Sequence, residues 1–240
     1  MRNGTHHNTM TALLSIAVLT ACITLSACGT HDRALDQLSA GPSTAAQTRS
    51  ALLTTADLPA RWAESPNMPS TDHGLTADLI DPQACSQAVS DMEATTQAWE
   101  SAPVVEKTTF TTTSAGAQIT LAEKITSDPG LDPRPVIDRL GRLISQCEEF
   151  TVNANGGAFS VAMAERDFID DTGDIGDIGL VETWSSSTGE AMTARYAYLL
   201  RGSNVIVISL MSPVVSDIGD NDFSAIVQAA SDKLAETSGE

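Results

Sequence analysis

The segment at residues 133–147 reads PRPVIDRLGRLISQC, and its pattern is the strongest indication of the fold class of this chain. Its apolar residues recur with the spacing of one helix face. These residues are Val136, Ile137, Leu140, Leu143, Ile144 and Cys147. The pattern predicts an amphipathic helix that covers a sheet, because the sequence on either side of it has the composition of β-strands.

The flanking segments predict a mainly antiparallel sheet of about six to seven strands. Before the helix, residues 104–113 and 117–126 are joined by a three-residue turn, Ser114-Ala115-Gly116, which indicates a hairpin. After it, strand segments follow at residues 150–153, 158–167, 180–185, 191–200 and 205–211. Two further helices are predicted over residues 83–92 and 221–236. Short connections favour antiparallel pairing, so we expect an α+β domain with about three packed helices.

The N-terminal residues have the features of a lipoprotein signal peptide. Residues 11–25 are apolar, but this run is shorter than the ~20 residues that a membrane-spanning helix needs. Leu25-Ser26-Ala27-Cys28 follows it and resembles the bacterial lipobox, in which a diacylglyceryl group is attached to the cysteine. We therefore expect residues 1–27 to be removed and Cys28 to be lipidated. Cys22 also ends a lipobox-like sequence and is the alternative.

The mature chain is expected to consist of a tether and one domain. Residues 28–49 lack sustained periodicity and predict a flexible, lipid-anchored tether, whereas residues 50–237 contain all the predicted elements. The formal net charge is −18, which disfavours binding to nucleic acid or to anionic lipid headgroups. The lipid would thus hold the protein on the extracytoplasmic face of the cell membrane.

Two cysteines, Cys85 and Cys147, remain in the predicted domain. An exported protein matures in a compartment where disulfides persist, so we predict a Cys85–Cys147 disulfide. Two buried free thiols are the alternative. Neither interpretation leaves a catalytic cysteine.

Few residues suggest a reaction, and no catalytic residue, metal site or cofactor is predicted. His73 is the one histidine in the predicted domain, and it has no Gly-x-Ser-x-Gly sequence to accompany it. The loop at residues 170–177 carries four aspartates, at Asp170, Asp171, Asp174 and Asp177. It could surround a Ca²⁺ ion, but its spacing differs from that of an EF-hand, and a solvated acidic turn is the simpler interpretation.

Four residues are candidates for ligand binding: Trp184, Arg195, Tyr196 and Arg201. Arg195 and Arg201 could bind an anion through two parallel hydrogen bonds. Tyr196 and Trp184 could stack on a sugar or line a lipid pocket. Core packing and surface ion pairs are the alternative roles. Because side chains alternate along a strand, Tyr196 and Tyr198 share one face of the strand and Arg195 and Arg201 share the other.

The pattern as a whole resembles actinobacterial lipoproteins whose domain is similar to the extracellular sensor domain of PknH-type receptor kinases. The likeness is carried by Leu52-Leu53-Thr54 with Asp57-Leu58-Pro59 and Trp62, by the two cysteine-bearing helices, and by Arg201-Gly202 before Val205-Ile206-Val207-Ile208. The resemblance implies an α+β domain with a cleft for an unknown ligand. The kinase domain is expected to have two disulfides, whereas this domain can form only one.

These observations favour a non-enzymatic envelope lipoprotein. Its sensor-like domain would bind a small molecule, a lipid or an envelope component. A module that docks on another envelope protein is the alternative, and a hydrolase is the third possibility.

Overall fold

Nine antiparallel strands form one sheet across the part of the chain that the computed structural model describes, namely residues 41–65, 77–132, 134–154, 157–168, 177–213 and 218–238. The order in the sheet is β1-β3-β4-β9-β8-β7-β6-β5-β2. The strands are β1 (Ala63–Glu64), β2 (Ile80–Asp81), β3 (Val104–Ser114), β4 (Ala117–Ser127), β5 (Glu149–Ala154), β6 (Gly157–Glu165), β7 (Ile178–Ser186), β8 (Ala191–Arg201) and β9 (Asn204–Pro213). The seven long strands are the predicted ones. The two extra strands, β1 and β2, have two residues each, too few for an alternating pattern to identify.

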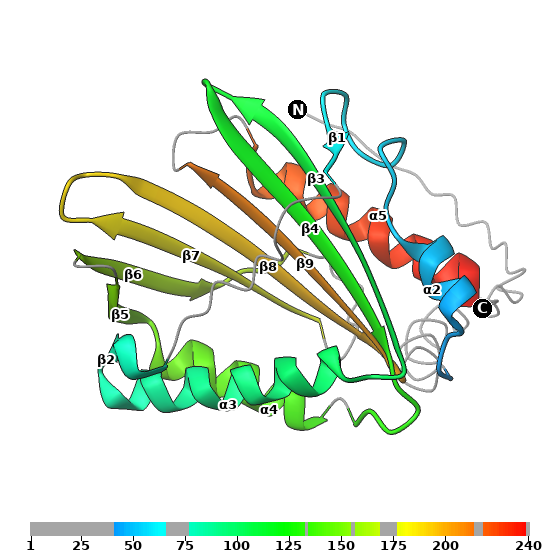
Figure 1. Ribbon diagram of the computed structural model, residues 1–240, viewed down its shortest axis with the longest axis horizontal. Coiled ribbons are helices and arrows are strands. Elements are labelled where there is room, and N and C mark those ends of the chain that lie inside the picture. The colour runs from blue at the N-terminus through cyan, green and yellow to red at the C-terminus, as the bar shows by residue number, and fades with distance from the viewer. Residues whose placement is uncertain are drawn as a thin grey trace, which may run out of the picture.

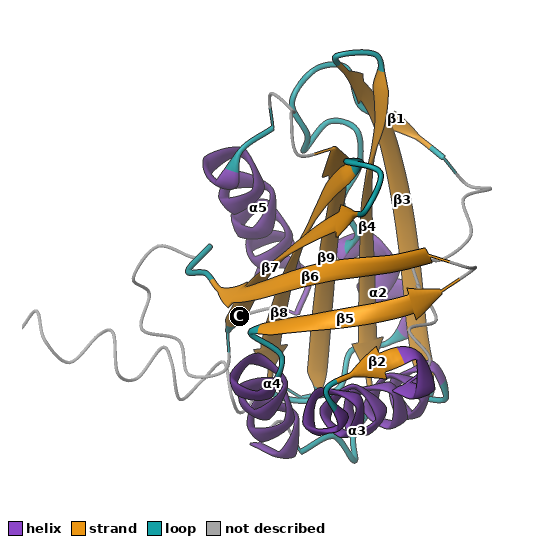
Figure 2. Cartoon of the chain, turned by 90° about the vertical axis from the view of Figure 1, so that its left-hand side faces the viewer, coloured by secondary structure: helices purple, strands orange, loops and turns teal. Residues whose placement is uncertain are grey.

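The described residues form four α-helices, one more than expected: α2 (Ala45–Ala51), α3 (Gln83–Glu100), α4 (Arg134–Gln146) and α5 (Asp220–Ser238). A short 3₁₀ turn, η1 (Ala77–Leu79), precedes β2. Helices α3 and α4 lie side by side against one face of the sheet, near one end of its strands. Helices α2 and α5 pack on the opposite face (Figure 1). Figure 2 shows that β5 and β6 run at a steep angle to β3 and β4, so the sheet is strongly twisted.

Each face of the sheet has its own hydrophobic core. Alternate residues of the central strands enter opposite cores, so that Leu199 and Ile206 face α5 while Leu200 and Val205 face α3 and α4. All four side chains are buried. A strand covered on both faces needs apolar residues at successive positions, which explains the continuous run Val205-Ile206-Val207-Ile208.

The predicted disulfide between Cys85 and Cys147 is confirmed. The two sulfur atoms are 2.13 Å apart, and both residues are fully buried in the core beneath α3 and α4. Cys85 lies in the first turn of α3, and Cys147 directly follows α4. The bond therefore ties together the two helices that cover one end of the sheet.

The last part of the expected tether is folded onto the domain. Thr44 caps α2 in a capping box with Gln47, and α2 packs against α5 and β3. Upstream of it, the backbone N–H of Ser43 donates to Ser127 Oγ at 2.7 Å and to Asn204 Oδ1 at 3.3 Å. The expectation that residues up to 49 are flexible is thus corrected, because the backbone from Ser43 onward has fixed partners.

Several expectations concern residues outside the described part of the chain. These are the signal peptide, Cys22 and Cys28, His73, and all of the acidic loop except Asp177. Within the described residues, no helix is both long enough and apolar enough to cross a membrane.

Candidate functional site

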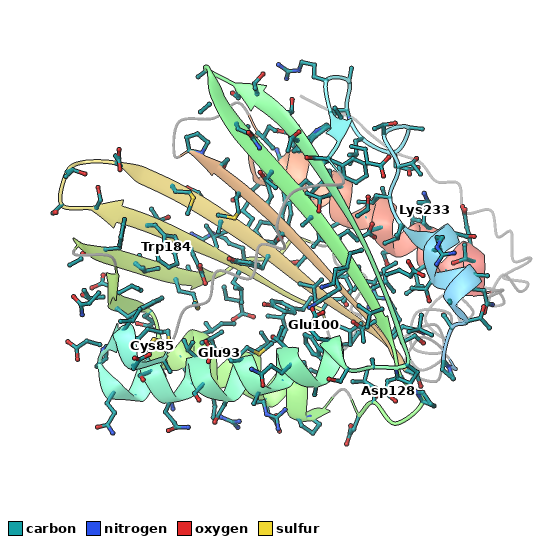
Figure 3. All side chains as sticks on the ribbon, in the orientation of Figure 1. Cys85, Glu93, Glu100, Asp128, Trp184 and Lys233 are labelled. Carbon is teal, nitrogen blue, oxygen red and sulfur yellow. A yellow bond between two sulfur atoms is a disulfide. The ribbon has the colours of Figure 1, made fainter. Side chains whose placement is uncertain are left out.

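A groove of about 140 Å³ lies between the C-terminal end of α3 and the sheet. Its walls come from α3, the β3–β4 hairpin and the paired strands β8 and β9. It is lined by Thr96, Trp99, Glu100, Lys107, Thr108, Thr109, Ala122, Glu123, Lys124, Tyr196, Tyr198, Val207 and Ser209. Figure 3 labels Glu100, where α3 ends beneath the strands.

Aromatic rings form the apolar part of the groove. Tyr196 and Tyr198 project from β8, and the Tyr198 ring lies 6.4 Å from the ring of Trp99, tilted by 50°. Burial raises the pKa of both phenols above the ordinary value of 10, so they are neutral proton donors near neutral pH. Neither hydroxyl hydrogen-bonds to another residue that the structure describes. Both are therefore available to a ligand.

The polar part of the groove consists of one carboxylate between two ammonium groups. Lys107 Nζ lies 2.9 and 2.8 Å from the two carboxylate oxygens of Glu100, and Lys124 Nζ lies 2.9 Å from Oε1. Partial burial alone would raise the pKa of Glu100, but hydrogen bonds from the two lysines hold it below its ordinary value. The three groups together carry one net positive charge.

A buried carboxyl group, that of Glu182, lies further along the same face of the sheet. Glu182 is 6% exposed, and its Oε2 accepts a hydrogen bond of 3.0 Å from Trp184 Nε1. Its sheet neighbours at the same level, Met163 and Ala194, are both apolar. Burial raises its pKa to about 7.

We expect Glu182 to make the domain less stable as the pH rises from 4.5 to about 7. Between pH 4.5 and about 7 the carboxyl group keeps its proton in the folded protein but has lost it in the unfolded chain, so a rising pH favours unfolding. Above pH 7 the group is ionised in both states, and stability declines no further on its account. Urea unfolding at a series of pH values would measure the decline. Glu182→Gln should make this decline in stability smaller, and the exposed control Glu190→Gln should not.

A second buried carboxyl group, that of Glu123, contributes a decline of the same sign, since burial also raises its pKa to about 7. Equal pH dependence in wild type and Glu182→Gln would contradict this role.

The structure does not bring the four predicted ligand-binding residues together. Tyr196 lines the groove, while Trp184 packs against Phe159 with ring centroids 6.4 Å apart. Arg195 and Arg201 lie on the opposite face of the sheet. Arg195 Nε is 2.7 Å from Asp220 Oδ1, and Arg201 forms a two-pronged pair of 2.5 and 2.8 Å with Asp177. Both guanidinium groups thus already have carboxylate partners.

The groove residues that the sequence reasoning missed include Glu100, Lys107 and Lys124. A two-residue turn at Ala115-Gly116, in place of the predicted three-residue turn, sets the register of β3 and β4 and places Lys107 directly opposite Lys124. Two like charges opposite each other destabilise a sheet unless something compensates them. Glu100 carried no such signal, because α3 was expected to end at Met92 and extends to Glu100.

No cluster of three or more histidine, cysteine, aspartate or glutamate side chains that could hold a metal occurs among the described residues. Asp177 is the one aspartate of the acidic loop among the described residues, and it forms an ion pair with Arg201. The side chains around the groove offer ammonium, carboxylate, hydroxyl and aromatic groups to a ligand.

An antiparallel sheet with two helices over one end, two on the other face and a groove at the edge of α3 defines this chain as an α+β domain. It has the fold of the extracellular domain of PknH from Mycobacterium tuberculosis, with a TM-score of 0.54 over 84% of this chain and 100% of that one, at 9% identity. An uncharacterized protein from Mycobacterium smegmatis aligns with a TM-score of 0.37, at 12% identity over 79% and 97% of the two chains. No protein-family model and no curated protein matches this sequence. The resemblance expected from the sequence is confirmed at the level of the fold.

Proposed function

We propose that this chain is a non-enzymatic lipoprotein on the extracytoplasmic face of the cell membrane, and that its domain binds a small molecule, lipid or envelope component in the α3 groove. The apolar leader and the lipobox ending in Cys28 support export and lipid anchoring. The Cys85–Cys147 disulfide supports an oxidising compartment. A similar fold in an extracellular domain fits the same location.

The groove is the observation that carries the binding role. It combines aromatic walls with phenol and ammonium groups, which is the composition that ligand sites use for affinity and orientation. The hydroxyls of Tyr196 and Tyr198 have no hydrogen-bonding partner among the described residues, so both can donate to a ligand in the groove.

Native mass spectrometry of the full chain, released gently from the membranes of an actinobacterial host, tests this proposal. The intact mass is expected to include a diacylglyceryl group and to lack residues 1–27. A non-covalent adduct is expected on the wild type and not on Ala122→Trp, because a large side chain at Ala122 would fill the groove.

The matched control is Ala158→Trp, an equally large substitution at an exposed position of β6 outside the groove. It should keep the adduct. An adduct of equal abundance on both variants would place binding elsewhere. No adduct on any variant would contradict groove binding and favour the alternative, a module that docks on another envelope protein.

A further inference from the structure

We propose that the α3 groove recognises a small amphipathic anion, with its negative group between Lys107 and Lys124 and a compact apolar body against Tyr196 and Tyr198. This inference rests on the proposed function, since it names the ligand class of the same groove. Two opposed lysines, their carboxylate partner and the apolar wall each support it.

The two lysines are placed in a way that folding alone does not favour. The chain has only three lysines and a formal charge of −18, yet Lys107 and Lys124 face each other across β3 and β4 and line the same groove. Their mutual repulsion is a cost that a sheet ordinarily avoids. The arrangement concentrates positive charge at one point of an acidic protein, where an anion would be attracted.

Glu100 already bridges the two lysines, and a ligand anion would share them with it. Both of its oxygens contact the lysines, and it is the last residue of α3. A carboxylate at a helix C-terminus is electrostatically unfavourable, so the two ammonium groups and not the helix hold it there. Its side chain is 34% exposed, against 41% for Lys107 and 16% for Lys124. Water and ligand therefore reach this ion pair.

The charge at the groove selects for a single negative charge. Glu100 neutralises one of the two lysines and leaves one net positive charge. The carboxyl of Glu123 does not oppose a ligand there, because it points to the other face of the sheet, where it accepts a hydrogen bond of 2.7 Å from the Leu53 backbone N–H. A monoanion such as a carboxylate thus completes the balance, and a polyanion would exceed it.

The neighbouring surface suits a compact apolar body with polar contacts at one end. Tyr198, Trp99 and Val207 provide apolar contact beside the lysines. A carboxylate held by Lys124 could also accept a hydrogen bond from a neutral phenol of Tyr196 or Tyr198. The small volume, about 140 Å³, favours a short body over a full lipid chain.

The test measures the affinity of the full chain in phosphatidylcholine nanodiscs for 3-phenylpropionate and for its neutral counterpart, 3-phenylpropionamide. Equilibrium dialysis against empty nanodiscs corrects for partition into the lipid. We expect the carboxylate to bind about tenfold more tightly than the amide, in line with hydrogen bonds to charged groups. Lys124→Gln should weaken binding of the carboxylate about tenfold and so remove this preference.

Two further variants separate recognition from general charge. Glu100→Gln should tighten binding of the carboxylate roughly fivefold, because the lysines lose their internal counterion. Arg142→Gln removes one positive charge from an exposed position of α4 and should change neither affinity by more than about twofold. Unfolding midpoints of all variants establish that each is folded during the measurement.

The outcomes distinguish the two proposals. Equal affinity for carboxylate and amide, both lost in Ala122→Trp, would keep the binding groove and overturn its preference for anions. If neither probe binds, the preference for a small amphipathic anion is overturned, while binding in the groove is judged separately by the adduct in native mass spectrometry. Weaker carboxylate binding in Glu100→Gln would show that Glu100 supports the ligand and does not compete with it for the lysines, which would also overturn the inference.

Discussion

Replacing Cys85 and Cys147 together by alanine is expected to lower the free energy of unfolding by about 4 kcal/mol. The disulfide closes a loop with a sequence separation of 62, and the loss of chain entropy in the unfolded state gives this magnitude. Since small domains are stabilised by only about 5–15 kcal/mol, a large part of the total would be lost. Urea unfolding of the oxidised wild type and the double variant measures the difference.

The reduced wild type provides the control for this effect. Dithiothreitol should shift its unfolding midpoint toward that of the double variant and should leave the variant itself unchanged. Both cysteines are fully buried in the folded state, so dithiothreitol should reach the disulfide only after partial unfolding. Equal midpoints in oxidised and reduced wild type would contradict a stabilising role.

Asp177→Asn is expected to destabilise the domain by about 3–5 kcal/mol, because it removes the carboxylate charge that pairs with the buried guanidinium of Arg201. The side chains of Arg201 and Asp177 are 9% and 8% exposed. Arg201 also donates to Ser231 Oγ of α5 at 3.1 Å, so the pair joins the start of β7, the end of β8 and α5. Thermal and urea unfolding would both report the loss.

Two further variants separate buried charge from lost packing. The double variant Asp177→Leu/Arg201→Met removes both charges and should recover most of the stability, since apolar residues can replace a buried pair. Asp220→Asn breaks the more exposed Arg195–Asp220 pair and should cost less than about 1 kcal/mol. A similar small cost for Asp177→Asn would contradict the structural role of Arg201.

This role changes how the arginines relate to ligand binding. From the sequence, Arg195 and Arg201 were candidate anion-binding residues, and the structure gives each an aspartate partner 24 or 25 positions away along the chain. Asp177 precedes β7 and Asp220 begins α5, so neither is near its arginine in sequence. Only the folding of β7, β8 and α5 against one another creates these pairs.

The elements with a strong local pattern were predicted well. The helix of residues 133–147 is α4, and the hairpin of residues 104–126 is β3 and β4. The missed helix α2 is short and lacks an apolar stripe, although Thr44 and Gln47 had the spacing of a capping box. The second half of α3 was missed because Thr95 and Thr96 are β-branched and weaken a helix pattern. Packing of the buried Trp99 carries the helix on to Glu100.

The long strands, three of the four described helices, the pairing of Cys85 with Cys147 and the resemblance in fold could all be predicted from the amino-acid sequence. They could be predicted because periodicity and cysteine content are local or countable properties. The groove could not be predicted in this way, because its walls come from separate parts of the chain: α3, the β3–β4 hairpin and β8–β9. Alternation along a strand assigns a side chain to one face, but the twist of the sheet and the length of α3 determine what lies opposite it. That is why Lys107, Lys124 and Glu100 meet in the folded protein although no single segment of the sequence contains all three.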